Sequence, residues 1–158
     1  MITFSRLGSL GRLGNQLFQY AALRSLGLEK GFDVAIPNPA TKEWHGQKCL
    51  LDNFNIEADY IELNYQPKFR YREPNSFKVD QNFFYLGDGV DLSGFFQSMY
   101  YFENHVEQIK KESQDRVDEE DRLYGKNYEG AFDRLFKGEK KTDKQGKEYR
   151  EGGLDEYV

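Results

Sequence analysis

The sequence predicts an α/β fold built on a parallel sheet. A short apolar run over residues 2–7 leads into a turn with a glycine at every third position, and an amphipathic helical pattern follows at once. A second apolar run, over residues 32–36, comes directly after the helical pattern. Because this β–α–β order is typical of three-layer α/β proteins, we expect a parallel sheet flanked by helices. The glycines of the turn are Gly8, Gly11 and Gly14.

The residue pattern predicts where the first strand, the first helix and the second strand begin and end. Residues 2–6 are expected to form a strand that enters the glycine turn. Apolar residues recur at helical spacing from Asn15 to about Glu29, and Gly31 stands where helices commonly end. The second strand, over residues 32–36, is closed by a proline-rich stretch at 37–39. We therefore expect strand, turn, helix and strand in that order.

The middle of the chain gives weaker patterns. Residues 49–56 form a short apolar segment that we interpret as packed loop or strand, whereas residues 57–76 give no clear pattern. Residues 77–86 and 90–96 look like strands separated by a Gly-Asp-Gly turn.

The segment from Phe83 to Phe102 is rich in aromatic rings, and two interpretations stay open for it. Such rings usually pack in a core, but sugar-binding sites also use aromatic faces, and composition does not separate the two. Within this segment Ser98 suits a helix N-cap, and apolar residues at helical spacing predict a helix as far as about residue 112. The rings are Phe83, Phe84, Tyr85, Phe95, Phe96, Tyr100, Tyr101 and Phe102.

The share of charged residues rises sharply after residue 112. Residues 113–158 hold 23 charged residues out of 46, whereas residues 1–112 hold 26 out of 112. The first segment can bury a core and is expected to be one domain. For the second segment we predict one or two short amphipathic helices, and from Gly138 onward a disordered or loosely helical tail.

Net charge and residue content narrow the class of protein. A net charge of −5 disfavours a general nucleic-acid or anionic-membrane binder. No apolar run approaches the ~20 residues of a membrane span, and the first residues lack a signal-peptide pattern. We therefore expect a cytoplasmic or membrane-peripheral protein. Cys49, His45 and His105 lack metal-finger spacing, so no metal is expected.

The glycine turn is the first candidate binding site. A strand, a glycine-rich turn and a helix together offer backbone N–H groups to an anionic ligand. The turn lacks both the G-x-G-x-x-G spacing of dinucleotide-binding folds and the lysine of a P-loop. Asn15 and Gln16 stand where the helix should begin, so their amides could reach the same ligand. The alternative is a tight strand–helix turn in which Asn15 caps the helix.

Three segments within the first 112 residues match the motifs of one family in order. Residues 11–21 read G-R-L-G-N-Q-L-F-Q-Y-A, residues 51–56 read L-D-N-F-N-I, and residues 92–102 read L-S-G-F-F-Q-S-M-Y-Y-F. They resemble G-G-[LM]-G-N-Q-[LM]-F-Q-Y-A, L-x-x-F-N-I and L-x-G-Y-F-Q-S-E-K-Y-F of the α-1,2-fucosyltransferase family (glycosyltransferase family eleven). Arg12 replaces the usual second glycine, as in the similar G-R-F-G-N-Q of protein O-fucosyltransferases.

The resemblance implies a Rossmann-like domain over residues 1–112, the N-terminal half of a GT-B-like fold. It implies transfer of fucose from GDP-fucose to a galactoside hydroxyl, with inversion and without a metal. Arg side chains and backbone N–H groups would neutralise the leaving diphosphate. The implied substrate-binding residues are Gly11, Arg12, Gly14, Asn15, Gln16, Gln97 and Ser98. No catalytic base is identified, and Asp52, Asp88 and Asp91 are candidates by carboxylate identity alone.

One departure from the family pattern keeps an alternative open. The family's donor motif, H-x-R-R-G-D, does not occur in this sequence. The alternative is therefore a truncated, non-catalytic half-domain that binds a sugar or pairs with a separate donor-binding chain.

Overall fold

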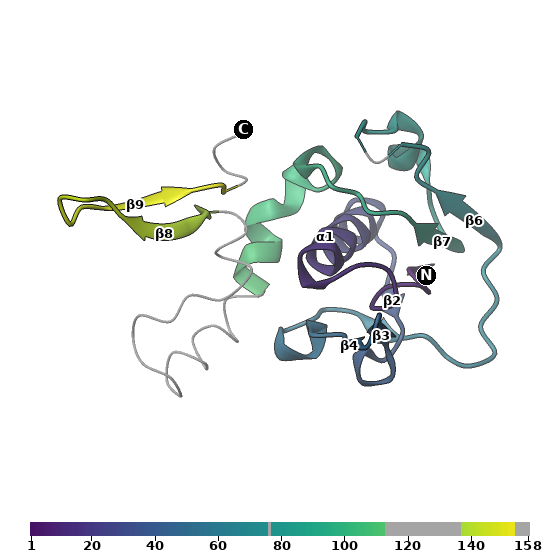
Figure 1. The fold of residues 1–158 in the computed structure, drawn as a ribbon. Coiled ribbons are helices and arrows are strands. Elements are labelled where there is room, and N and C mark those ends of the chain that lie inside the picture. Colours follow the sequence, from purple (N-terminus) through teal and green to yellow (C-terminus); the bar gives the residue numbers. More distant parts are fainter. Residues whose placement is uncertain (76, 113–136, 154–158) are drawn as a thin grey trace.

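The computed structural model describes residues 1–75, 77–112 and 137–153 (Figure 1). Its centre is a five-stranded sheet in the order β5-β2-β1-β7-β6, with every neighbouring pair parallel. The expected α/β fold with a parallel sheet is therefore confirmed. The strands are β1 (Ile2–Thr3), β2 (Val34–Ile36), β5 (Asp59–Tyr60), β6 (Phe69–Arg72) and β7 (Val90–Ser93).

The order of the strands differs from the familiar doubly wound order. In chain order the five strands lie 3-2-1-5-4 across the sheet, so the last two are exchanged relative to 3-2-1-4-5. The last strand, β7, therefore lies directly beside β1. Because all the strands are parallel, the loop after β7 and the glycine turn after β1 lie at the same edge of the sheet, and the exchange makes them neighbours.

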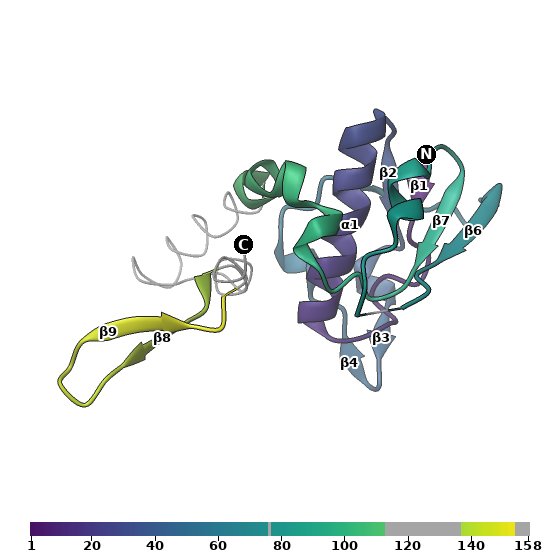
Figure 2. The ribbon, with the colours of Figure 1, turned by 90° about the horizontal axis from the view of Figure 1, so that it is seen from above.

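The helix α1 (Leu13–Lys30) follows the glycine turn and packs on one face of the sheet (Figure 2). It ends as expected at Gly31, whose φ of 70° is left-handed. Gly27 allows the close approach to β2, because a Cβ at this position would lie 2.4 Å from Cγ1 of Val34. Glycine within this helix is thus required by packing rather than being a weakness of the pattern.

The expected three-layer arrangement is wrong for the described residues. Figure 2 shows α1 and the short helical turns on one side of the sheet, with no described helix on the other side. The crossover from β2 to β5 holds only short 3-10 turns and a small hairpin, and the crossover over residues 61–68 holds no helix. The crossover over residues 61–68 is too short for a packed α-helix, and Pro37 and Pro39 disfavour a helix at the start of the longer crossover from β2 to β5.

Short elements occupy the crossovers and the segment after β7. The hairpin is β3 (Glu43–Trp44) with β4 (Gln47–Lys48). The 3-10 turns are η1 (Pro39–Thr41), η2 (Leu51–Asn53), η3 (Gln81–Tyr85), η4 (Met99–Tyr101) and η5 (Glu103–His105). Residues 106–112 are α-helical, so the helix expected after Ser98 begins as two 3-10 turns.

The strand expected over residues 77–86 is wrong, because this segment contains η3. The side chain of Asp80 accepts a hydrogen bond from the backbone N–H of Asn82 at 3.2 Å and so starts the turn. Phe83 is then fully buried, where it contacts Phe96 and Tyr101 with ring centroids 5.5 and 4.9 Å apart. Local capping and one deeply buried ring therefore override the strand-like composition.

The disordered or helical tail expected from Gly138 onward is wrong for residues 138–153. These residues contain an antiparallel hairpin of β8 (Glu139–Thr142) and β9 (Glu148–Glu151). The side chain of Asp143 accepts hydrogen bonds from the N–H groups of Gln145 and Lys147 at 2.9 and 2.8 Å, which closes the turn. The short helices predicted between residues 113 and 136 lie outside the described residues, as do residues 154–158.

Candidate functional site

The candidate site lies at the carboxyl ends of the two central strands, β1 and β7. These strands are joined by Asp91, which is 4% exposed. Its oxygens accept hydrogen bonds from Thr3 Oγ1 at 2.7 Å, from the N–H of Ser5 at 2.8 Å and from Ser5 Oγ at 2.7 Å. Because three donors on the β1 side share this carboxylate, Asp91 fixes the two strands together.

The glycine turn presents an uncapped helix N-terminus. Gly11 has a φ of 90°, and Arg12 is the N-cap of α1 without any side-chain hydrogen bond to the helix. The first turn of α1 contains no acidic residue, and the Arg12 side chain is exposed. The first N–H groups of the helix are thus open to an anionic ligand.

Asn15 does not cap the helix, so the capping alternative is wrong. The residue lies inside the first turn of α1, and its Oδ1 accepts a hydrogen bond from Nε2 of Gln97 at 2.6 Å. The two residues are 82 positions apart in the chain, and Gln97 is exposed. The fold therefore brings together two residues from separate predicted motifs.

Gly11 and Gly14 play different parts in the turn. A Cβ at Gly11 would lie 2.5 Å from Nδ2 of Asn15, whereas a Cβ at Gly14 would meet no atom within 4 Å. Gly11 therefore leaves the space that the Asn15 amide occupies. Gly14 keeps the surface of the first helical turn open.

Two buried glutamines hold the turn in shape. Gln16 is 2% exposed, and its Nε2 donates to the carbonyl of Gly11 at 3.0 Å. Gln19 is fully buried, and its Nε2 donates to the carbonyls of Leu10 and Gly94, both at 3.0 Å. The Gln16 amide thus stabilises the turn through the Gly11 carbonyl, and the Gln19 amide connects the turn to the loop after β7. The sequence analysis missed Gln19, although a second amide on the buried face of a helix is a usable signal.

The loop after β7 is held by a buried carboxylate that the sequence analysis also missed. Glu73 is 8% exposed, and its Oε1 accepts from the N–H groups of Phe95 and Phe96 at 3.3 and 3.1 Å. Phe96 has a left-handed φ of 51°, which costs on the order of 1 kcal/mol for a residue with a side chain. Glu73 thus stabilises a strained loop that presents Gln97. Its segment, residues 57–76, carried no sequence pattern from which this role could be read.

Ser98 caps the first 3-10 turn after this loop. Its Oγ accepts a hydrogen bond from the N–H of Tyr100 at 3.3 Å, as expected of an N-cap. This bond occupies one lone pair of the hydroxyl and fixes the course of the chain after Gln97.

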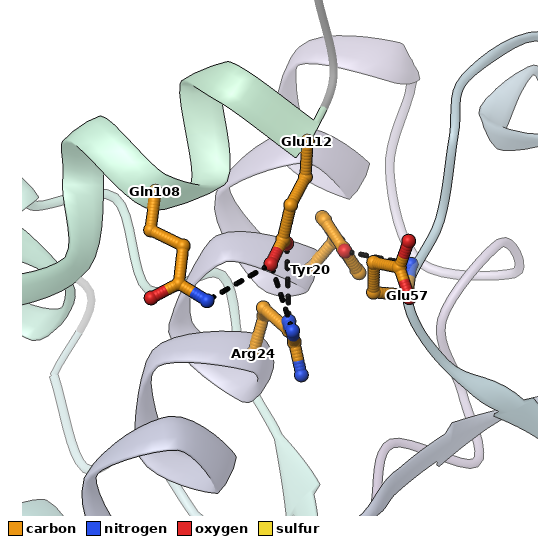
Figure 3. A network of polar contacts seen from close by, with 5 residues as sticks. All are labelled: Tyr20, Arg24, Glu57, Gln108 and Glu112. Atoms are coloured by element: carbon orange, nitrogen blue, oxygen red, sulfur yellow. Dashed lines mark hydrogen bonds and ion pairs between the residues drawn. The ribbon is translucent and has the colours of Figure 1, made fainter. Parts of the chain in front are cut away.

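Figure 3 shows the polar contacts that hold residues 106–112 against α1. Arg24 donates from Nε and Nη2 to the two carboxylate oxygens of Glu112 at 3.1 and 2.8 Å. The Tyr20 hydroxyl accepts from the N–H of Glu57 at 3.0 Å, and burial raises the pKa of Tyr20 above its ordinary value. These contacts anchor the end of the first 112 residues and a crossover loop to the same helix.

The two remaining carboxylate candidates are Asp88 and Asp52. Asp88 forms ion pairs with Lys68 and with the N-terminal amino group, and hydrogen bonds from these groups lower the pKa of Asp88 to about 2. It precedes β7 and so lies at the opposite edge of the sheet from the glycine turn. Asp52 is exposed on η2 and lines a cavity of about 440 Å³ beside β2 and β5.

The described residues contain neither a group of metal-ligating side chains nor a helix that could span a membrane. Within residues 1–75, 77–112 and 137–153, no group of three or more His, Cys, Asp or Glu side chains is placed to hold a metal ion. In the same part of the chain, no helix has the length and apolar character needed to cross a membrane.

Comparison with known proteins identified no relative of this chain. A scan against protein-family models, a search of curated proteins and a search of solved structures each returned no match. The functional interpretation therefore depends on the site itself. The site offers the N-terminus of a helix whose N-cap side chain makes no capping hydrogen bond, an exposed guanidinium and two interacting amides, a set suited to a polar ligand that carries negative charge.

Proposed function

We propose that this chain carries the N-terminal half of a glycosyltransferase site of the α-1,2-fucosyltransferase type. In this role, it would help to transfer fucose from GDP-fucose to a galactoside hydroxyl with inversion. The observation that carries the proposal is the hydrogen bond between Asn15 and Gln97. Two motifs that resemble the family's motifs meet at one edge of the sheet, where α/β proteins bind their ligands.

Each residue of the site has a role in the proposed reaction. Inverting transfer needs a neutralised diphosphate and an oriented acceptor hydroxyl. Arg12 and the free N–H groups at the start of α1 would supply positive potential to the diphosphate without a metal. The amides of Asn15 and Gln97 would hydrogen-bond sugar hydroxyls, and Gly14 would leave room for the ligand.

The second candidate function is a non-catalytic module that binds a sugar or a separate donor-binding chain. The observation that favours it is the absence of H-x-R-R-G-D from the sequence. Among the candidate bases, Asp91 already accepts three hydrogen bonds and Asp88 lies at the opposite edge of the sheet, which also favours this candidate.

A transfer assay separates the two candidates. The purified chain is incubated with GDP-fucose and a galactoside, and fucosylated product and free GDP are measured. Catalysis by this chain predicts product that Asn15→Ala abolishes, with Tyr85→Ala as the matched surface control. If neither product nor GDP-fucose hydrolysis is detected at high protein concentration, catalysis by this chain alone is excluded.

Thermal unfolding in the presence of GDP then tests the binding site itself. A ligand raises the melting temperature only if the folded chain binds it. A rise with GDP that Arg12→Ala reduces supports a nucleotide-sugar site in this chain. A melting temperature unchanged by GDP favours the non-catalytic module.

A further inference from the structure

The aromatic segment that follows the glycine-turn site in the chain divides into buried and exposed rings. Phe83, Phe96, Tyr101 and Phe102 are between 0 and 2% exposed and pack in the core. Tyr100 is instead 62% exposed, and Phe84 is half-buried at the surface. The core interpretation therefore accounts for the four buried rings but not for Tyr100, nor for Tyr85, which is 84% exposed.

Phe84 and Tyr100 line two adjoining cavities between η3 and the end of α1. One cavity has a volume of about 250 Å³ and the other about 440 Å³, and both are lined by Phe84, Tyr100, Glu103 and Asn104. Because the two cavities share these four residues, we treat them together and call them the ring groove. Small-molecule sites of several hundred Å³ are typical, so a ligand of the size of one or two sugar rings fits this space.

Polar side chains from α1 and η5 line one of the two cavities. His105 lies between two side chains of α1, with Nδ1 3.0 Å from Ser25 Oγ and Nε2 3.6 Å from Glu29 Oε2. Ser25 is 4% exposed, so this contact is held within the packing of α1 against η5. On the wall, Phe84 packs edge-on against Phe83 with ring centroids 5.3 Å apart. A ligand would thus meet a preformed surface.

The chemistry of the ring groove suits a neutral sugar. Aromatic faces stack on the C–H face of a sugar ring, while amide and carboxylate groups bind its hydroxyls. Glu29, Glu103 and Asn104 supply such groups, and Lys30 is the cation that lines the same cavity. Two carboxylates beside one ammonium group disfavour an anionic ligand, and the polar floor disfavours a purely apolar one.

We propose that the ring groove binds a neutral saccharide at a site separate from the glycine turn. Asn15 and Ser25 are ten positions apart on α1, which corresponds to about 15 Å along the helix axis. The proposal does not require fucose transfer, because no residue of the ring groove belongs to the turn site.

An NMR titration of the isotope-labelled full chain tests the proposal. The probes are lactose, maltose and chitobiose, with GDP in a separate arm. We expect at least one disaccharide at about 10 mM to shift the signals of Tyr100 and Asn104. The variant Tyr100→Ala should weaken this binding about tenfold, which corresponds to about 1.4 kcal/mol. The matched control is Tyr85→Ala, because Tyr85 is 84% exposed and lines neither cavity.

Other outcomes overturn the proposal. They are no shift at Tyr100 or Asn104 with any disaccharide, equal loss in the Tyr85→Ala control, or stronger binding of the apolar probe indole at these residues. A shift at Asn15 and Gln97 in the GDP arm reports on the proposed function alone, so the two proposals can fail separately.

Discussion

The two ends of α1 offer two kinds of surface. At its N-terminal end, backbone N–H groups, Arg12 and the Asn15–Gln97 amide pair surround a glycine turn. At its C-terminal end, Phe84, Tyr100 and the Ser25–His105 contact form the ring groove. The first surface suits an anion because it is made of backbone donors, and the second suits a neutral sugar because it is made of rings. Segment 94–105 connects the two, so changes in this segment can separate their properties.

The largest expected effect comes from Glu73, which shapes the loop of the N-terminal surface. Glu73→Ala leaves the buried N–H of Phe96 without its acceptor and should lower the free energy of unfolding by about 3 kcal/mol. Urea unfolding measures this loss. Glu73→Gln is the matched control, because its Oε1 can still accept from both N–H groups, and it should lose about 1 kcal/mol. Equal losses in the two variants would show that the acceptor oxygen does not hold the loop.

The next effect compares two glycines of the turn. Gly11→Ala forces a left-handed alanine against Asn15 and should cost about 2 kcal/mol. Gly14→Ala lies within the helix, with open space around its Cβ, and should stabilise the fold by about 0.5 kcal/mol. Thermal unfolding of both variants is the measurement. A reversed order would contradict the described geometry of the turn.

A smaller change in the free energy of unfolding is expected from loss of the ion pair between Arg24 and Glu112. The two side chains are 19% and 15% exposed, so loss of this bidentate pair should cost about 1.5 kcal/mol. Arg24→Ala should also accelerate amide exchange over residues 103–112 without changing exchange at Gly11 to Asn15. Lys111→Ala, at an exposed position of the same helical segment, is the surface control and should change stability little. Faster exchange at both ends of α1 would mean that the two surfaces are not independent.

The smallest expected change in the free energy of unfolding concerns the hydroxyl of Tyr101, a residue that lines the ring groove. Burial raises the pKa of Tyr101 from 10.0 to about 12. The unfolded chain therefore releases this proton first, so the associated stability is present below pH 10 and is lost as the pH rises through about 12. Urea unfolding at rising pH should show this loss, and Tyr101→Phe should show a shallower one. Equal slopes would mean that Tyr101 does not titrate in this way.

The sequence predicted the features of this fold that are local in the chain. The apolar run, the glycine turn and Gly31 act through neighbouring residues, so the first strand, α1 and its end could be read directly. The position of β7 in the sheet could not be predicted from the sequence, because the exchange of the last two strands depends on contacts between distant segments. The 3-10 turn at Gln81–Tyr85 and the hairpin after Gly138 were missed because single Asp side chains at 80 and 143 close turns within segments of misleading composition.

The same division applies to the candidate site. Asn15 and Gln97 belong to motifs and were predicted as site residues, but their contact depends on the sheet order. Glu73 has no motif and acts through two backbone N–H groups that only the fold brings near it. Tyr100 could not be told apart from the buried Tyr101 by composition, since both stand in the same aromatic run.

A GDP-fucose titration monitored by NMR tests the central claim, that the glycine turn forms one wall of a nucleotide-sugar site. The account predicts shifts confined to residues 11–15 and Gln97, lost in Gly11→Ala and retained in the surface control Tyr85→Ala. Unchanged signals at these residues, or shifts only in the ring groove, would contradict the account.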